Sequence, residues 1–256
     1  MTPIYADPVT VPVLEIRDAE IRTRDRLILE HLDLTVNAGE FLAVLGPNGA
    51  GKTTLFRAIL GLEPLERGEV RVLGAPARRG DQRIGYVPQQ RMFPRGTPLT
   101  GRGLVTLGRS GTRFGLPFSG AKDRAAVRQA IEAVGGERLA RRPIGELSGG
   151  EQQRLRIAQA IVDDPAMLLL DEPLSSLDAE HRGDIVELAV EQQRRGAAIL
   201  FITHDLDPVV GVAHRALIIR GDGSYWLGDP ANARSADLHD HPHHLDDLAV
   251  GGVTEG

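Results

Sequence analysis

The sequence contains no cysteine, and it is poor in aromatic residues and in long hydrophobic runs. Without cysteine, a disulfide scaffold, Cys-ligated zinc or iron–sulfur sites and thiol catalysis are excluded. The aromatic content of 4% argues against a base-stacking platform for single-stranded nucleic acid. The longest apolar runs, such as 197–202, fall far short of the roughly 20 residues that a membrane-spanning helix needs. The first ten residues show no signal-peptide pattern, so we expect a cytoplasmic protein.

The sequence does have enough apolar residues for one globular domain, or for one domain with a lobe attached. It has 256 residues, of which 41% are hydrophobic, so it can bury a large core. The formal net charge is −5, whereas proteins that bind nucleic acids in general are usually basic. We therefore expect no nucleic-acid partner.

Strand patterns occupy both ends of the chain. Residues 13–17 and 32–36 alternate apolar and polar side chains, and 41–45 form a continuous apolar run, which is typical of a strand buried on both faces. A helix is predicted over 53–60, closed by Gly61. Further strands are predicted at 70–73, 84–87, 167–170 and 197–203, with a hairpin around 221–223.

The middle of the chain, from about residue 98 to 163, has helical patterns and no convincing strand. One helix is predicted over 122–134, before two glycines, and another over 151–162. The apolar side of the second comprises Leu155, Ala158, Ile161 and Val162. The pattern indicates a helical lobe inserted into an α/β core. The polar, acidic residues after 228 predict a loosely ordered tail.

Residues 46–53 read GPNGAGKT and fit the phosphate-binding pattern G-x4-G-K-[ST], between a predicted strand and a predicted helix. Glycines let backbone N–H groups approach phosphate oxygens, and the following helix N-terminus adds positive potential. Lys52 is expected to reach the β- and γ-phosphates, and the Thr53 hydroxyl is expected to ligate Mg²⁺. The alternative is an ordinary glycine-rich turn, but Lys52 is one of only two lysines in the chain and stands at the required position.

Two adjacent carboxylates, Asp171 and Glu172, follow the apolar run 167–170. They are therefore expected at the carboxyl edge of a parallel sheet, where ligands bind. Asp171 would hold Mg²⁺, directly or through water, and Glu172 would be the base that polarises the attacking water. A plain strand end capped by acidic residues is the alternative, and the phosphate-loop pattern in the same chain disfavours it.

The segment 147–154, LSGGEQQR, resembles the signature of the ATP-binding-cassette (ABC) family, and the resemblance extends over about residues 13–228. It implies a P-loop NTPase fold: a RecA-like mixed sheet, an antiparallel β-subdomain and an inserted helical subdomain at about 90–163. Residues 1–12 would be an N-terminal extension and 229–256 a C-terminal tail. In such proteins the signature faces ATP bound on a second subunit.

The resemblance also implies roles for single residues. Gln89, in YVPQ, resembles a glutamine that senses Mg²⁺ and the attacking water, and His204, in ITHD, resembles a switch histidine that contacts the γ-phosphate. Segment 175–178 resembles a loop that crosses the dimer interface. The expected catalytic residues are Lys52, Gln89, Glu172 and His204, and the expected Mg²⁺ ligands are Thr53, Gln89 and Asp171. The expected nucleotide contacts are Gly46, Pro47, Asn48, Gly49, Ala50, Gly51, Lys52, Thr53, Thr54, Ser148, Gly149, Gly150 and Asp178.

The mechanism and partners follow from the same resemblance. Two chains are expected to pair head to tail around two MgATP and to drive a separate membrane permease that works with an extracytoplasmic substrate-binding protein. The chain would then be peripheral on the inner face of the cell membrane. Segments 142–154 and 203–223 resemble ATPases of zinc and manganese importers. An iron-chelate or haem importer and a soluble ABC ATPase without a permease are the alternatives.

Two features stand outside this pattern. The family usually carries an aromatic residue that stacks on adenine, but alignment places Thr23 there, and we expect Arg22 or Arg24 to lie over the base. The tail is rich in histidine and could bind a divalent metal ion, although it could equally be a solvated segment that binds metal only incidentally. Its candidate ligands are His239, His241, His243 and His244.

Overall fold

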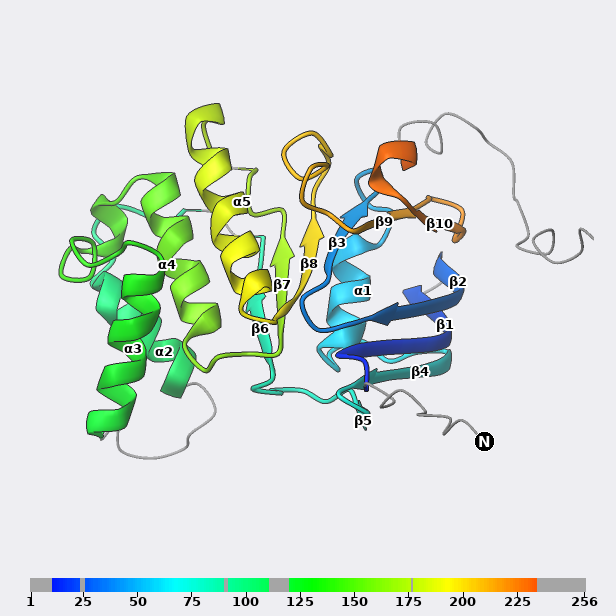
Figure 1. The fold of residues 1–256 in the computed structure, drawn as a ribbon, viewed down its shortest axis with the longest axis horizontal. Coiled ribbons are helices and arrows are strands. Elements are labelled where there is room, and N and C mark those ends of the chain that lie inside the picture. Colours follow the sequence, from blue (N-terminus) through cyan, green and yellow to red (C-terminus); the bar gives the residue numbers. More distant parts are fainter. Residues whose placement is uncertain (1–10, 24–25, 90–91, 111–119, 176, 234–256) are drawn as a thin grey trace, which may run out of the picture.

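The computed structural model describes residues 11–23, 26–89, 92–110, 120–175 and 177–233, and it contains two sheets and five α-helices among them (Figure 1). Within these ranges, no helix is both long and apolar enough to cross a membrane. The fold is the expected α/β arrangement with mixed sheets.

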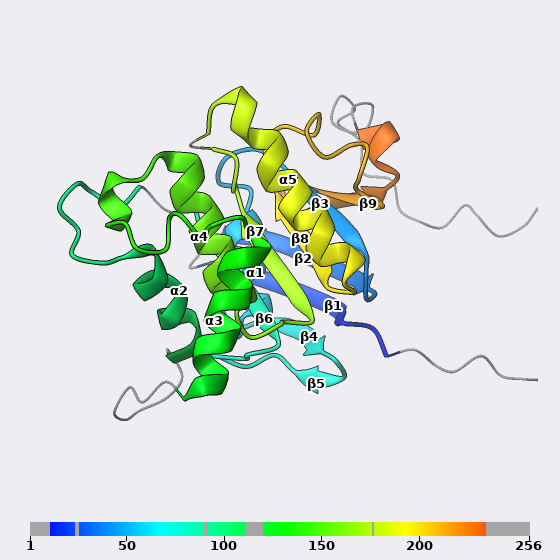
Figure 2. The same cartoon turned by 60° about the vertical axis from the view of Figure 1, so that its left-hand side comes forward.

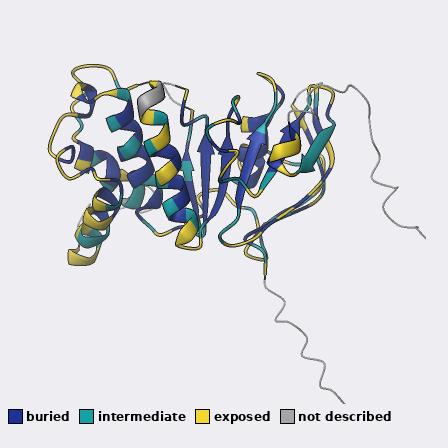
Figure 3. Cartoon of the chain, turned by 45° about the horizontal axis from the view of Figure 1, so that its top comes forward, coloured by how far each residue is buried: buried dark blue, intermediate teal, exposed yellow. Residues whose placement is uncertain are grey.

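The larger sheet has six strands in the order β10-β9-β3-β8-β7-β6. All neighbouring strands in it are parallel except the antiparallel pair β9 and β10. Their bounds are β3 Phe41–Leu45, β6 Ile84–Val87, β7 Met167–Asp171, β8 Ala198–Ile202, β9 Arg215–Ile219 and β10 Tyr225–Gly228. Every residue of β7 and β8 is buried, which agrees with the continuous apolar runs 167–170 and 198–202 and extends to the charged Asp171 (Figure 3). The strands and the hairpin predicted in this sheet are confirmed.

The smaller sheet is antiparallel, in the order β2-β1-β4-β5. Its strands are β1 Leu14–Thr23, β2 Arg26–Val36, β4 Arg67–Val72 and β5 Ala75–Pro76. Strands β1 and β2 are longer than predicted because bulges interrupt their alternation. At these bulges Asp18 (φ 46°) and His31 (φ 49°) take left-handed backbone conformations, with 2.7 Å between Asp18 Oδ1 and His31 Nδ1.

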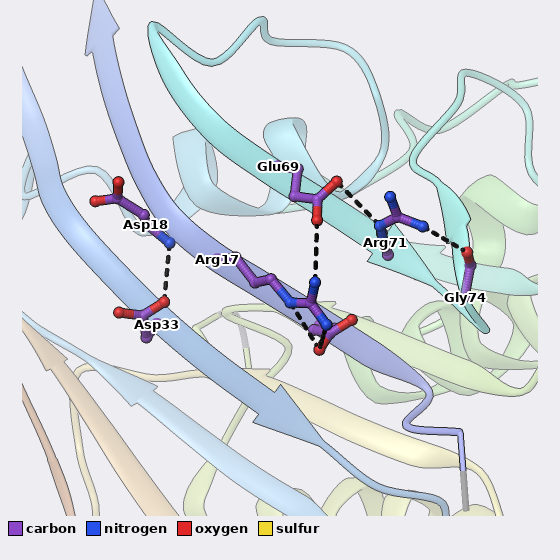
Figure 4. Close-up of polar contacts among 7 residues, drawn as sticks. Arg17, Asp18, Asp33, Glu69, Arg71 and Gly74 are labelled. Atoms are coloured by element: carbon purple, nitrogen blue, oxygen red, sulfur yellow. Dashed lines mark hydrogen bonds and ion pairs between the residues drawn. The ribbon is translucent and has the colours of Figure 1, made fainter.

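Charged side chains cover the outer face of this smaller sheet (Figure 4). Arg17 on β1 donates to Glu69 on β4, and Glu69 accepts a second hydrogen bond from Arg71. Across the other strand pair, the backbone N–H of Asp18 donates to the Asp33 carboxylate. The outer face is thus exposed and polar, and the apolar face turns inward.

The helices cover both faces and one edge of the larger sheet (Figures 1 and 2). Their bounds are α1 Lys52–Ile59, α2 Gly101–Ser110, α3 Ala121–Ala133, α4 Gly149–Ile161 and α5 Ala179–Arg194. Helix α1 packs in one core between the two sheets, and α5 packs in a second core on the opposite face of the larger sheet. Helices α2, α3 and α4 form the helical group expected in the middle of the chain, beside the β6 edge.

Two glycines of α2 allow it to approach its neighbours closely. A Cβ atom on Gly108 would lie 2.3 Å from the backbone oxygen of Gln159 in α4, and one on Gly101 would lie 2.7 Å from the backbone oxygen of Leu139. Glycine weakens an isolated helix, but here it permits tight packing. The predicted apolar side of α4, Leu155 to Val162, is buried in this contact. Helix α5, by contrast, is not among the elements predicted from the sequence.

Candidate active site

The residues singled out in the sequence gather at the carboxyl edge of the larger sheet. Four adjacent parallel strands end there: β3 leads into the glycine-rich loop, β8 into His204, β7 into Glu172, and β6 into Gln89. Parallel strands place their carboxyl ends on the same edge. The sheet order therefore brings segments that are more than 100 positions apart in sequence to one site.

The glycine-rich loop between β3 and α1 has a backbone that only glycine can adopt at two points. Gly46 (φ 141°) and Gly51 (φ 109°) have positive φ angles. A Cβ atom on Gly46 would lie 2.2 Å from the backbone oxygen of Ile219, and one on Gly51 would lie 1.9 Å from Ile28 Cγ2. The loop is therefore held tightly between β9 and β2.

Lys52 is the first residue of α1, and its side chain folds back under this loop. Its Nζ donates to the carbonyl oxygens of Gly46 at 2.7 Å and Pro47 at 3.1 Å, and the residue is only 6% exposed. Burial lowers the pKa of Lys52, while the nearby carboxylates of Glu172 and Asp171 act in the opposite direction. The loop thus presents a partly desolvated positive charge, suited to an anionic ligand.

Asp171, at the end of β7, has donors for one carboxylate oxygen only. Its Oδ2 accepts from Thr53 Oγ1 at 3.0 Å and from the Tyr86 hydroxyl at 3.4 Å. Its Oδ1 is buried and has no hydrogen-bond partner among the described residues. Burial raises the pKa of Asp171, and it raises the pKa of Tyr86 to about 12 with help from the Asp171 charge.

The donor set around Asp171 fits a magnesium ion. An unpartnered buried carboxylate oxygen beside a threonine hydroxyl offers the hard oxygen ligands that Mg²⁺ prefers. The sequence pattern gave no role to Tyr86, although Tyr86 stands three residues before Gln89 in the same YVPQ segment.

Glu172 and Gln89 meet directly across the β7 and β6 strand ends. Gln89 Nε2 donates to Glu172 Oε2 at 2.7 Å. Glu172 takes a left-handed conformation (φ 47°), and its backbone N–H donates to the Ile202 oxygen at 3.1 Å. Strain of this kind persists only where neighbouring structure enforces it. The carboxylate is therefore held at a defined place beside Asp171.

Ser148 begins helix α4 with a reciprocal cap. Its hydroxyl accepts from the Glu151 backbone at 3.3 Å, and the Glu151 carboxylate accepts from the Ser148 backbone at 2.7 Å. A Cβ atom on Gly150 would lie 3.5 Å from the ring of His181. The reciprocal cap thus fixes the start of α4, where Ser148 is exposed and Gly150 is buried against His181.

The remaining candidates are exposed, half-buried or outside the described ranges. His204 is exposed at the end of β8, and Asp178 is exposed at the start of α5, where its side chain makes no capping hydrogen bond. Thr54 is half-buried in α1. The tail residues His239, His241, His243 and His244 lie outside the part of the chain that the structure describes.

The expected base-stacking position is an exposed strand end. Thr23 is the last residue of β1, and Arg22 turns toward Glu20, donating from Nε at 2.6 Å. Arg24 lies outside the described residues. The ion pair thus holds the Arg22 side chain against Glu20 of its own strand.

Comparison with known proteins agrees with this geometry. The profile of the family described as ABC transporter matches residues 29–175. The zinc transport system ATP-binding protein TroB of Treponema pallidum (strain Nichols) is 37% identical, over 82% of this chain and 79% of that protein. The zinc import ATP-binding protein ZnuC of Pseudomonas entomophila (strain L48) is 34% identical, over 90% of this chain and 88% of that protein. The manganese transport system ATP-binding protein MntB of Halalkalibacterium halodurans is 34% identical, over 77% and 79%.

Solved structures of similar fold include a chain of a transporter described as metal-chelate type ABC, in an inward-facing conformation. It has a TM-score of 0.76 and 29% identity, over 86% of this chain and 84% of that one. A second is cbiO1 from Clostridium perfringens, part of the ABC transporter complex cbiONQ. Its TM-score is 0.74 with 26% identity, over 88% of this chain and 92% of that one.

Proposed function

The chain belongs to the ABC transporter family and is an ATPase of that family, and from this premise we propose that it drives an importer of a divalent metal ion, zinc or manganese. The observation that carries the catalytic part is the cluster of Asp171, Thr53, Glu172 and Gln89 at one sheet edge beside Lys52. The metal substrate rests on the similarity to zinc and manganese transport proteins over most of the chain.

In hydrolysis, Lys52 would offset the charge of the β- and γ-phosphates held by the loop Gly46 to Thr54. Glu172 would accept a proton from the water that attacks the γ-phosphorus, while the bond from that phosphorus to the bridging oxygen of the β-phosphate breaks and ADP leaves. Gln89 would hold the Glu172 carboxylate in place. His204 would contact the γ-phosphate. Thr53, Asp171 and Gln89 would hold Mg²⁺, which when bound neutralises charge on the phosphate oxygens.

A second copy of the chain would complete each site. The N-terminus of α4, with the exposed Ser148, the half-buried Gly149 and the buried Gly150, and the exposed Asp178 would face ATP bound to the loop of the partner. Two MgATP would thus lie between two copies arranged head to tail. Hydrolysis would remove the shared γ-phosphate contact and open the dimer.

The remaining partners follow from the importer assignment. We infer that the stretch from about Gln89 to Gly145 contacts a membrane permease, within an ATP-binding domain of residues 13–228 whose helical subdomain spans about 90–163. An extracytoplasmic substrate-binding protein would deliver the ion, and the chain would sit at the inner membrane face. Residues 1–12 would be an extension, and 229–256 a tail that could bind a divalent metal ion.

Co-purification with its permease and reconstitution into proteoliposomes tests the proposal. ATP-dependent uptake of radioactive Zn²⁺ or Mn²⁺ is expected with the parent chain and not with Glu172→Gln. The similarity to a metal-chelate type transporter favours a second candidate, an iron-chelate or haem importer. Uptake of an iron chelate or haem with no uptake of free Zn²⁺ or Mn²⁺ would select that candidate instead. A chain that co-purifies with no multi-span membrane protein would contradict both.

A further inference from the structure

The glycine-rich loop has a second cationic neighbour besides Lys52, and it is Arg26, at the start of β2. Its Nη2 donates to the backbone oxygen of Gly221 at 3.3 Å. A Cβ atom placed on Gly49 would lie 3.8 Å from Arg26 Nη1. The Arg26 side chain therefore spans from the β9–β10 hairpin to the loop, although 195 positions separate Arg26 from Gly221.

Strand β2 brings Arg26 to this place because of its alternation. Ile28, two residues on, shares the strand face with Arg26, and it packs against Gly51 so closely that a side chain there would overlap it. Ile28 is 5% exposed, whereas Arg26 is exposed. One face of β2 thus covers the loop and ends in an accessible guanidinium group.

The sheet order decides which end of a bound nucleotide this group meets. Strands β8, β7 and β6, which carry His204, Glu172 and Gln89, lie on one side of β3, and β9 and β10 lie on the other. The γ-phosphate has to face the hydrolytic residues, an orientation that rests on the proposed function. The nucleoside must then leave the loop toward β9, β10 and the start of β2, on the side of α1 away from α2 to α4 (Figure 1).

We propose that Arg26 contacts the nucleoside of bound ATP and sets part of its affinity. The planar guanidinium group can stack on a purine ring. The chain has no aromatic residue between Tyr5 and Phe41 that could do so from this part of the sequence. Arg22, on the neighbouring strand, is held by Glu20 instead and serves as the matched control.

Calorimetric titration of the full chain with Mg-ATP and with Mg-tripolyphosphate tests this assignment. Arg26→Ala is expected to weaken ATP binding by about fivefold to tenfold and to leave tripolyphosphate binding within about twofold. Arg26→Lys, which keeps the charge but not the plane, is expected to lose nearly as much ATP affinity as Arg26→Ala. Arg26→Tyr is expected to restore it, and Arg22→Ala is expected to change nothing.

Two results would overturn the inference: Arg26→Ala binding ATP as tightly as the parent, or losing equal affinity for ATP and tripolyphosphate, which would indicate a phosphate contact. Lys52→Ala separates this inference from the site assignment, since it should weaken both ligands. If Lys52→Ala binds both ligands as the parent does, the loop is not the phosphate site, whatever the Arg26 variants show.

Discussion

Replacing Asp171 by asparagine should make the nucleotide-free protein more stable while abolishing its catalysis. The Asp171 carboxylate is 1% exposed, and its Oδ1 has no partner in the described structure. Asparagine keeps the shape of the side chain and removes the charge. Its amide oxygen can still accept the hydrogen bonds that Thr53 and Tyr86 donate to Oδ2.

The expected gain in the free energy of unfolding is small because the substitution has two opposing effects. It removes a buried charged acceptor without a partner, which costs the parent protein about 1–3 kcal/mol or more. It also weakens two charge-assisted hydrogen bonds to neutral ones, which offsets part of that gain. We therefore expect Asp171→Asn to raise the free energy of unfolding by about 1 kcal/mol. For a chain of this size that corresponds to a rise in Tm of roughly 2–4 °C.

The gain should depend on pH in a known direction. Burial raises the pKa of Asp171 in the folded state. The stabilisation that this group contributes is thus present below its unfolded pKa and is lost as pH rises through the folded pKa. The advantage of Asp171→Asn is accordingly largest at neutral pH and shrinks on acidification.

Urea unfolding at several pH values measures this effect, and Asp81→Asn is the matched control. Asp81 is also buried, but Arg83 donates to both of its oxygens and lowers its pKa. Its neutralisation should therefore destabilise the protein, by about 1 kcal/mol or more. If Asp171→Asn is less stable than the parent without nucleotide, the unpartnered Asp171 carboxylate does not destabilise the nucleotide-free protein, and the prediction is wrong.

In the presence of Mg-ATP, the parent protein should become more stable than Asp171→Asn, which is the reverse of the order expected without nucleotide. Saturating Mg-ATP stabilises a protein that binds it, by about 2.7 kcal/mol at a hundredfold excess over Kd. Asp171→Asn lacks a proposed Mg²⁺ ligand and should gain much less. Equal stabilisation of both proteins by Mg-ATP would show that Asp171 is not part of the magnesium site.

Three further predictions address the dimer, the helical group and the tail. Glu172→Gln should accumulate as an ATP-bound dimer on size-exclusion chromatography in Mg-ATP; a monomer there would contradict the head-to-tail arrangement. Gly108→Ala should destabilise the protein by about 1–3 kcal/mol because its Cβ would meet the Gln159 backbone, whereas Gly183→Ala, with open space around it in α5, should stabilise it by up to about 1 kcal/mol in denaturant titrations. Micromolar Zn²⁺ should alter the ATPase activity of the full chain but not that of a chain truncated after Asp237. If Zn²⁺ changes both activities equally, the tail has no part in the response to Zn²⁺.

The sequence predicts local features well because they rest on local chemistry. The run 41–45 and the loop 46–53 are each contained in a few consecutive residues. Their backbone requirements, such as positive φ at Gly46 and Gly51, leave a direct trace in the sequence.

Features that depend on distant segments could not be predicted in the same way. Bulges at Asp18 and His31 break the period-2 pattern and hide the full length of β1 and β2. Gly108 weakens a helix in isolation, yet α4 makes it necessary for packing. The place of Arg26 beside Gly49 depends on the pairing of β2 and on the β9–β10 hairpin, which a short segment of sequence does not reveal.

An experimental structure of Glu172→Gln bound to Mg-ATP would test the head-to-tail arrangement of two copies most directly. We expect two copies with two nucleotides, each triphosphate lying between Lys52 of one copy and Ser148 of the other. A triphosphate held by Lys52 and Ser148 of the same copy, or bound away from residues 46–53, would contradict it.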